Sequence, residues 1–218
     1  MNIAILSAII SFLSLDITIA FQVLISSPLF ACPILGWLLG DVWLGFELGF
    51  LFQLLWLGRI PAGAYIVPEG NIASMVAAGL VLLNHETAFP HTTLMLAFLE
   101  GILVSYLGAL LTFFYRKLNG RILDFIMREV DFSHFKRIPL LEAASGLIYF
   151  LMVYVLTYSF LRVNELFLPE IIRIIGRLFE EQLIVVKPII MGIGLAFVIQ
   201  LLREAVRKNL GKKIEKTS

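Results

Sequence analysis

The sequence predicts an all-α polytopic membrane protein, and its composition and its long apolar runs carry this prediction. The 218 residues are 60% hydrophobic and 15% charged, whereas soluble domains are about 45–50% apolar and about 25% charged. The runs each approach the ~20 residues that cross a bilayer as a helix, and the alternating pattern of a membrane β-barrel is absent. We expect about six transmembrane segments in one integral membrane domain over residues 1–203, followed by a basic tail over 204–218.

The first apolar segment, residues 3–25, carries two polar side chains, Asp16 and Gln22. An ionisable side chain within a membrane is costly and usually faces a cavity or a partner. Both residues are therefore candidate solute contacts, although Asp16 can equally lie near an interface. The segment lacks a basic start, so we expect it to be retained as a span and not cleaved as a signal peptide.

The second segment, residues 29–57, is too long for one straight crossing. It would extend roughly 40 Å as a helix against a hydrocarbon core of ~30 Å, so it must tilt or break. Asp41 follows Gly40 and marks a natural break point. The second half carries Gln53, a candidate solute contact. Two GxxxG pairs would let helix backbones approach closely: Gly36/Gly40 and Gly45/Gly49.

A polar interruption, residues 58–74, separates two strongly apolar segments. It holds two prolines, three glycines, Glu69 and Asn71. Irregular backbone at membrane depth must face protein or a water-filled cavity, and transporters place their binding sites in such broken helices. We expect broken or re-entrant helices over 36–74, with Glu69 and Asn71 lining a polar solute site. The alternative is a short wet loop between ordinary spans.

Four further apolar segments are expected downstream, over residues 72–83, 92–115, 138–161 and 183–202. Between them, the mixed-charge stretches 116–137 and 162–182 carry apolar residues at helical spacing. This pattern predicts amphipathic helices at the membrane surface.

The distribution of basic residues predicts the orientation of the chain. Lys and Arg are concentrated in 116–137 and in the tail, so the positive-inside rule places both regions in the cytoplasm. The connection at 84–91, which has no Lys or Arg, then lies outside. With six crossings, both termini are expected to be cytoplasmic.

The sequence lacks the motifs of the common catalytic classes. It has no P-loop, GxSxG, HExxH or CxxC, and its net charge of +1 does not suggest nucleic acid. Cys32 is the single cysteine, so no disulfide forms within the chain and zinc lacks a ligand cluster. We expect no enzyme activity, no cofactor and no metal site.

The ordered motifs between residues 28 and 83 resemble the IIC component of mannose/sorbose-type phosphotransferase systems. The resemblance is carried by Pro28-Leu29-Phe30-Ala31-Cys32, Gly36-Trp37-Leu38-Leu39-Gly40-Asp41, Gln53-Leu54-Leu55-Trp56-Leu57-Gly58, Gly63-Ala64-Tyr65-Ile66-Val67-Pro68-Glu69 and Ala73-Ser74. It continues more weakly to Arg203. A whole set in the same order and spacing is much more specific than any single piece.

The resemblance implies a sugar permease subunit of a bacterial plasma-membrane system. A IID membrane subunit would pair with this chain to form the sugar path, as a homo-oligomer of IIC–IID units in the bilayer. Cytoplasmic IIA and IIB subunits would relay phosphate, with IIB phosphorylating the arriving sugar. The expected sugar contacts are Glu69, Asn71 and Gln53, with Asp16 and Gln22 as weaker candidates.

The sequence departs from the family pattern at several positions. Gln53 stands where members usually have Glu, Glu69 where Asp is common, Ser27 where Arg often precedes the proline, and Pro61 where mannose-specific members have Asn. These departures bear on which sugar is carried. Two other interpretations stay open: the substrate-binding membrane subunit of another uptake system, such as a vitamin-uptake S component, and a membrane scaffold without a solute.

Overall fold

The computed structural model describes residues 2–18, 23–56, 68–129 and 138–215, and these residues form helices and their short connections. Three helical stretches are long and apolar enough to cross a membrane, Pro90–Ile122, Leu141–Phe179 and Gln182–Glu204. The predicted all-α membrane architecture is therefore confirmed. The helices are α1 (Ile3–Thr18), α2 (Pro28–Leu39), α3 (Val42–Trp56), α4 (Gly70–Leu83), α5 (Pro90–Glu129), α6 (Ile138–Phe179), the short 3-10 helix η2 (Gln182–Val185) and α7 (Val186–Glu215).

The long second apolar segment folds back on itself as an antiparallel hairpin of α2 and α3. Gly40 ends α2 with a φ of +97°, a left-handed conformation that glycine adopts without steric cost. The Asp41 carboxylate then accepts a hydrogen bond of 2.9 Å from the Leu44 amide and so caps α3. The break predicted at Gly40–Asp41 is confirmed.

Glycines let the two arms of this hairpin touch at the backbone. A Cβ atom added to Gly45 would lie 2.6 Å from the carbonyl oxygen of Cys32 and 2.9 Å from the Cα atom of Gly36. A Cβ atom added to Gly49 would lie 2.5 Å from the carbonyl oxygen of Pro28. Gly36, Gly45 and Gly49 therefore serve close packing within one hairpin, whereas Gly40 has no neighbour within 4 Å of its Cβ position and acts at the end of α2.

Helix α4 forms the centre of the protein. It packs against α1, α2, α3, α5 and α6, and every residue from Ile72 to Leu82 is buried. Small side chains allow this close approach: a Cβ atom on Gly101 of α5 would lie 3.2 Å from the Cβ of Ala77. The start of α4, which follows the polar interruption, is thus held at a fixed place among the other helices.

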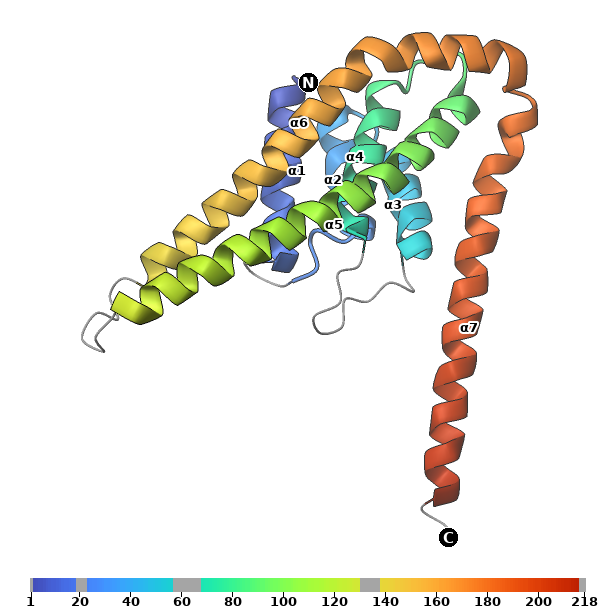
Figure 1. The fold of residues 1–218 in the computed structure, drawn as a ribbon. Coiled ribbons are helices and arrows are strands. Elements are labelled where there is room, and N and C mark those ends of the chain that lie inside the picture. Colours follow the sequence, from blue (N-terminus) through green and yellow to red (C-terminus); the bar gives the residue numbers. More distant parts are fainter. Residues whose placement is uncertain (1, 19–22, 57–67, 130–137, 216–218) are drawn as a thin grey trace.

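Helices α5 and α6 continue through stretches that the sequence predicted as separate surface helices. Helix α5 does not end at Tyr115 but runs on to Glu129, and α6 runs past Leu161 to Phe179 with Pro169 inside it. Figure 1 shows α5 and α6 as an oblique antiparallel pair, with α6 changing direction before the chain descends through α7. Polar hydrogen bonds join the pair, because Tyr115, Ser145 and Asn119 bond to one another over 2.6 to 3.0 Å.

The hairpin gives the long second segment a re-entrant course. We expected residues 29–57 to tilt or break, with broken or re-entrant helices over 36–74, and α2 and α3 indeed enter and leave at the same end. In Figure 1, α1 begins at the end of the molecule where α6 leads into α7, whereas α7 ends at the opposite end. The outer ends of α1 and α7 therefore lie at opposite ends of the molecule.

Candidate functional site

Asp16 and Asn71 lie in one hydrogen-bond network at the end of α1. Asp16 is 3% exposed, and its carboxylate accepts hydrogen bonds from the Val23 amide (2.9 Å) and the Ser26 amide (3.3 Å). The Ser26 hydroxyl also donates to this carboxylate over 3.4 Å. Asn71, in the first turn of α4, donates from its side-chain amide to the Ser26 hydroxyl oxygen over 3.3 Å. The Asp16 charge is thus held by a turn that α4 contacts directly.

Gln53 approaches the same turn from α3. Its side-chain oxygen accepts a hydrogen bond of 3.5 Å from the Leu29 amide, which is one of the donors left unpaired at the start of α2. Asp16, Gln53 and Asn71 therefore converge from three helices on residues 23–29. The remaining weak candidate, Gln22, lies outside the described residues.

Glu69 lies just before α4 and faces α5 instead of this turn. Its amide donates to the carbonyl oxygen of Ser105 over 2.9 Å, and its carboxylate accepts a hydrogen bond of 2.7 Å from the Thr112 hydroxyl. Gly108 makes the approach possible, because a Cβ atom there would lie 2.8 Å from the Cβ of Glu69. The candidate residues thus form two groups, one on each side of the start of α4.

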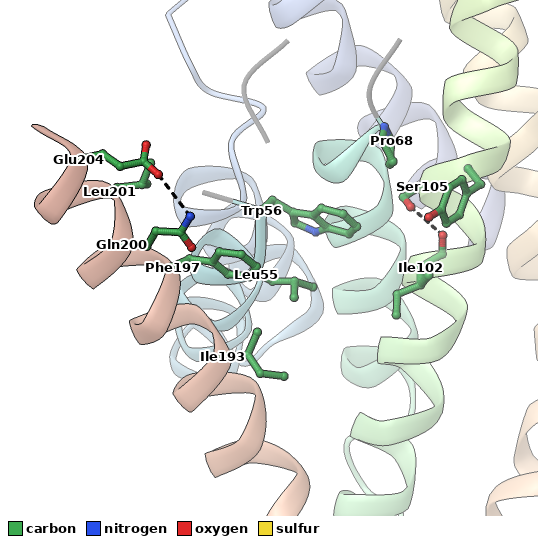
Figure 2. Close-up of a pocket in the computed structure, with 11 residues that line it drawn as sticks. Leu55, Trp56, Pro68, Ile102, Ser105, Ile193, Phe197, Gln200, Leu201 and Glu204 are labelled. Atoms are coloured by element: carbon green, nitrogen blue, oxygen red, sulfur yellow. Dashed lines mark hydrogen bonds between the residues drawn. The ribbon is translucent and has the colours of Figure 1, made fainter. Parts of the chain in front are cut away.

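A pocket of about 510 Å³ opens beside Glu69, between the end of α3, the start of α4, α5 and α7. Figure 2 shows Trp56 in this pocket, with Gln200 and Glu204 of α7 on one side and Ser105 of α5 on the other. None of the four predicted contacts that the structure describes, Asp16, Gln53, Glu69 and Asn71, lines it. The pocket adjoins the predicted site through Ser105, whose carbonyl oxygen accepts the Glu69 amide proton.

Sequence reasoning passed over Gln200 and Glu204. A signal for them was available, because both are polar, stand four residues apart and lie at the end of an apolar run. Residues at that spacing share one face of a helix.

Charged groups connect the start of α7 and the turn before it to the rest of the protein. Lys187 forms an ion pair with Glu47 of α3. In the turn after α6, the Glu180 carboxylate accepts hydrogen bonds from the His91 amide (2.8 Å), the Thr92 amide (3.0 Å) and the Thr92 hydroxyl (2.7 Å). Glu180 therefore caps the start of α5 from another part of the chain.

The titration of Glu180 follows from these contacts. Desolvation alone would raise the pKa of this carboxyl, but the hydrogen bonds from Thr92 and His91 and the nearby His91 charge together hold the pKa below its ordinary value of 4.5. A carboxyl whose pKa is lowered by folding stabilises the folded state above its unfolded-state pKa. That stabilisation is lost as the pH falls through the lower, folded-state value.

We expect Glu180→Gln to destabilise the protein near neutral pH by about 0.5–2 kcal/mol, the range for losing a helix cap. The wild type should lose this advantage as the pH falls below about 4.5, so the melting curves of the two proteins should converge in acid. Thermal unfolding from pH 7 to pH 3 measures the difference. Glu181→Gln is the matched control, because the Glu181 side chain is the exposed neighbour. A gap that is constant over this pH range would contradict the capping role.

Comparison with known proteins identifies the family. The family described as "PTS system sorbose-specific iic component" matches residues 1–208. The chain is 28% identical over 118 residues to the PTS system sorbose-specific EIIC component of Klebsiella pneumoniae, a match that covers 54% of this chain and 42% of that protein. It is 33% identical over 60 residues to the mannose-specific EIIC component of Escherichia coli K12, over 28% of this chain and 23% of that protein. The matches thus span less than half the length of these relatives.

Solved structures share the fold. One chain described as a membrane protein superposes with a TM-score of 0.67 at 22% identity, over 92% of this chain and 77% of that one. A chain from the complex of the mannose transporter ManYZ with microcin E492 gives a TM-score of 0.62 at 21% identity, with the same coverage. The family match over nearly the whole sequence, on this fold, shows that the chain belongs to the family of sorbose-specific IIC components of the phosphotransferase system.

Proposed function

We propose that the chain is the sugar-permease subunit of a mannose/sorbose-type phosphotransferase system. The observation that carries the proposal is the gathering of polar side chains from several helices around the start of α4. Asp16, Gln53 and Asn71 bond to the turn at 23–29, and Glu69 lies just before α4. A helix interrupted between apolar segments, with polar groups on both sides, is the arrangement in which transporters bind solutes.

The residue types suit a sugar. Ring hydroxyls both donate and accept hydrogen bonds, so they need acceptors such as carboxylates and amides that do both. We propose Glu69, Asn71 and Gln53 as sugar contacts, with Asp16 positioning the turn that Asn71 and Gln53 contact. These side chains bond to the protein in this structure, so a sugar would replace part of that hydrogen bonding.

Partners and orientation belong to the same proposal. A IID membrane subunit would complete the sugar path in a bacterial plasma membrane, and cytoplasmic IIA and IIB subunits would bring phosphate to the sugar. This chain would act as a carrier and would not itself be phosphorylated. The basic ends of α5 and α7 would face the cytoplasm under the positive-inside rule. The start of α1 lies at the other end of the molecule from the end of α7 (Figure 1), so in this proposal it would face outside, in place of the cytoplasmic N-terminus expected from six crossings.

A sugar-binding screen tests the proposal. The chain is co-expressed with a IID subunit of the same type of phosphotransferase system, purified, and assayed by thermal shift with hexoses, hexosamines and ketoses. We expect a saturable shift with one sugar class. Stabilisation by a vitamin instead of any sugar would favour an S-component role, and a well-folded complex that binds no solute would favour a scaffold.

A further inference from the structure

Gln200 and Glu204 lie at the end of the last apolar span, on the face of α7 that lines the pocket. The span runs from Gln182 to Glu204, and the two side chains share this face with Ile193 and Phe197, all four lining the 510 Å³ pocket. The Gln200 amide donates to the Glu204 carboxylate over 3.3 Å. Both side chains are exposed, so their polar groups are open to a ligand in the pocket.

The opposite wall of the pocket offers aromatic surface. Trp56 lies between α7 and Ser105 of α5 (Figure 2). Ser105 is buried, and its hydroxyl donates to the carbonyl oxygen of Ile102 over 2.6 Å. The carboxylate and amide groups of α7 suit ring hydroxyls, and an apolar aromatic face suits the C–H side of a sugar ring. A volume of about 510 Å³ also falls in the usual range for small-molecule sites, about 300–1,000 Å³.

The charge of the pocket selects between a sugar and its phosphate. Among the described residues that line it, Glu204 is the charged one and neither Lys nor Arg takes part. A carboxylate attracts hydroxyl donors but repels a phosphate group. The described part of the lining therefore suits a neutral polyhydroxylated ring better than a phosphorylated one.

We propose that this pocket is a second sugar subsite, next to the one at Glu69, in which Gln200 and Glu204 bind hydroxyls of the unphosphorylated sugar against Trp56. The proposal rests on the proposed transport function and adds residues that lie outside the motifs of the sequence resemblance. Its continuity with the first subsite comes from Ser105. This residue lines the pocket and also accepts the hydrogen bond of the Glu69 amide.

Trp56 provides a local reporter for the test. The chain has three tryptophans, and Trp37 and Trp43 are 70% and 80% exposed, so both can be replaced by phenylalanine to leave Trp56 alone. The purified full chain, in a detergent without a sugar headgroup, is titrated with D-mannose, L-sorbose and mannose 6-phosphate. Fluorescence reports occupancy at Trp56, and calorimetry reports binding anywhere on the protein.

We expect mannose or sorbose to change Trp56 fluorescence saturably. The affinity for mannose 6-phosphate should be lower by about tenfold or more. Glu204→Gln and Gln200→Leu should each weaken the affinity about tenfold, and Glu204→Gln should also reduce the discrimination against the phosphate. The control Glu181→Gln, an exposed carboxylate in the turn before α7, should leave both values unchanged.

Three results would overturn the subsite. In the first, calorimetry detects sugar binding that depends on Glu69, but Trp56 fluorescence does not change and the Gln200 and Glu204 variants keep the wild-type affinity. This result would remove the subsite and leave the transport function standing. A response to octyl glucoside but to neither free sugar would assign the pocket to a lipid headgroup. Absence of sugar binding in both readouts would remove the subsite, and the separate screen of the complex with IID would then decide whether the transport function stands.

Discussion

Replacing Glu69 with alanine is expected to weaken sugar binding by about ten- to a hundredfold, because hydrogen bonds to a charged group are worth about 1.5–3 kcal/mol and Glu69 is the carboxylate of the first proposed subsite and adjoins the second. The protein should still insert and fold, since α4 stays buried on all sides without this side chain. Calorimetry of the purified complex with the sugar found in the screen measures the loss.

The variant Thr112→Val tests whether Glu69 contacts the sugar or only joins α4 to α5. It removes the hydroxyl that donates to Glu69 over 2.7 Å but leaves the carboxylate in place. If Glu69 contacts sugar, this variant should keep an affinity within a few fold of the wild type. Equal loss of binding in Glu69→Ala and Thr112→Val would show that Glu69 acts by joining α4 to α5, and retained binding in Glu69→Ala would remove it from the site.

Gly45→Leu is expected to have the largest effect on stability. Its Cβ atom would lie 2.6 Å from the carbonyl oxygen of Cys32 and 2.9 Å from the Cα atom of Gly36, and backbone atoms cannot move aside as a flexible side chain can. Overpacking costs about 1–3 kcal/mol where side chains can adjust, so a clash with backbone should cost at least about 3 kcal/mol. We expect little folded protein in membranes, measured by fluorescence-detected size exclusion.

Gly120→Leu is the matched control for this change. Gly120 lies in α5, and a Cβ atom there would have no neighbour within 4 Å. This variant should be expressed and should elute like the wild type. If Gly45→Leu and Gly120→Leu gave equal amounts of folded protein, the hairpin would not depend on the close approach of α2 and α3.

The elements that follow from local sequence could be predicted, and those that depend on distant partners could not. The break at Gly40–Asp41 was visible because glycine and aspartate mark helix ends wherever they meet an over-long apolar run. The ends of α5 and α6 were misplaced, because charged residues can extend a helix as readily as they can end it. No local signal marks whether residue 115 or residue 129 is the last.

The candidate site shows the same limit. Composition identified Glu69 and Asn71 as polar residues in an apolar setting, but they bond to Thr112 and Ser26, which are distant in sequence. Their separation into two groups depends on how α4 is surrounded. From the sequence, Glu204 was assigned to the basic tail. Its place beside the pocket depends on the packing of α7 on α3 and α5, which local sequence does not reveal.

The short central helices have a consequence for the distance that a polar solute must travel. Helices α1 to α4 contain 16, 12, 15 and 14 residues, so each is about 18 to 24 Å long, against about 30 Å for the hydrocarbon core. Helix α5, with 40 residues, reaches about 60 Å and spans a full membrane even when strongly tilted. The long outer helices would thus hold the protein in a bilayer of ordinary thickness, while the short central helices would cross less than the full hydrocarbon core. A bound sugar would then need to move only a fraction of the membrane thickness to pass from one aqueous side to the other.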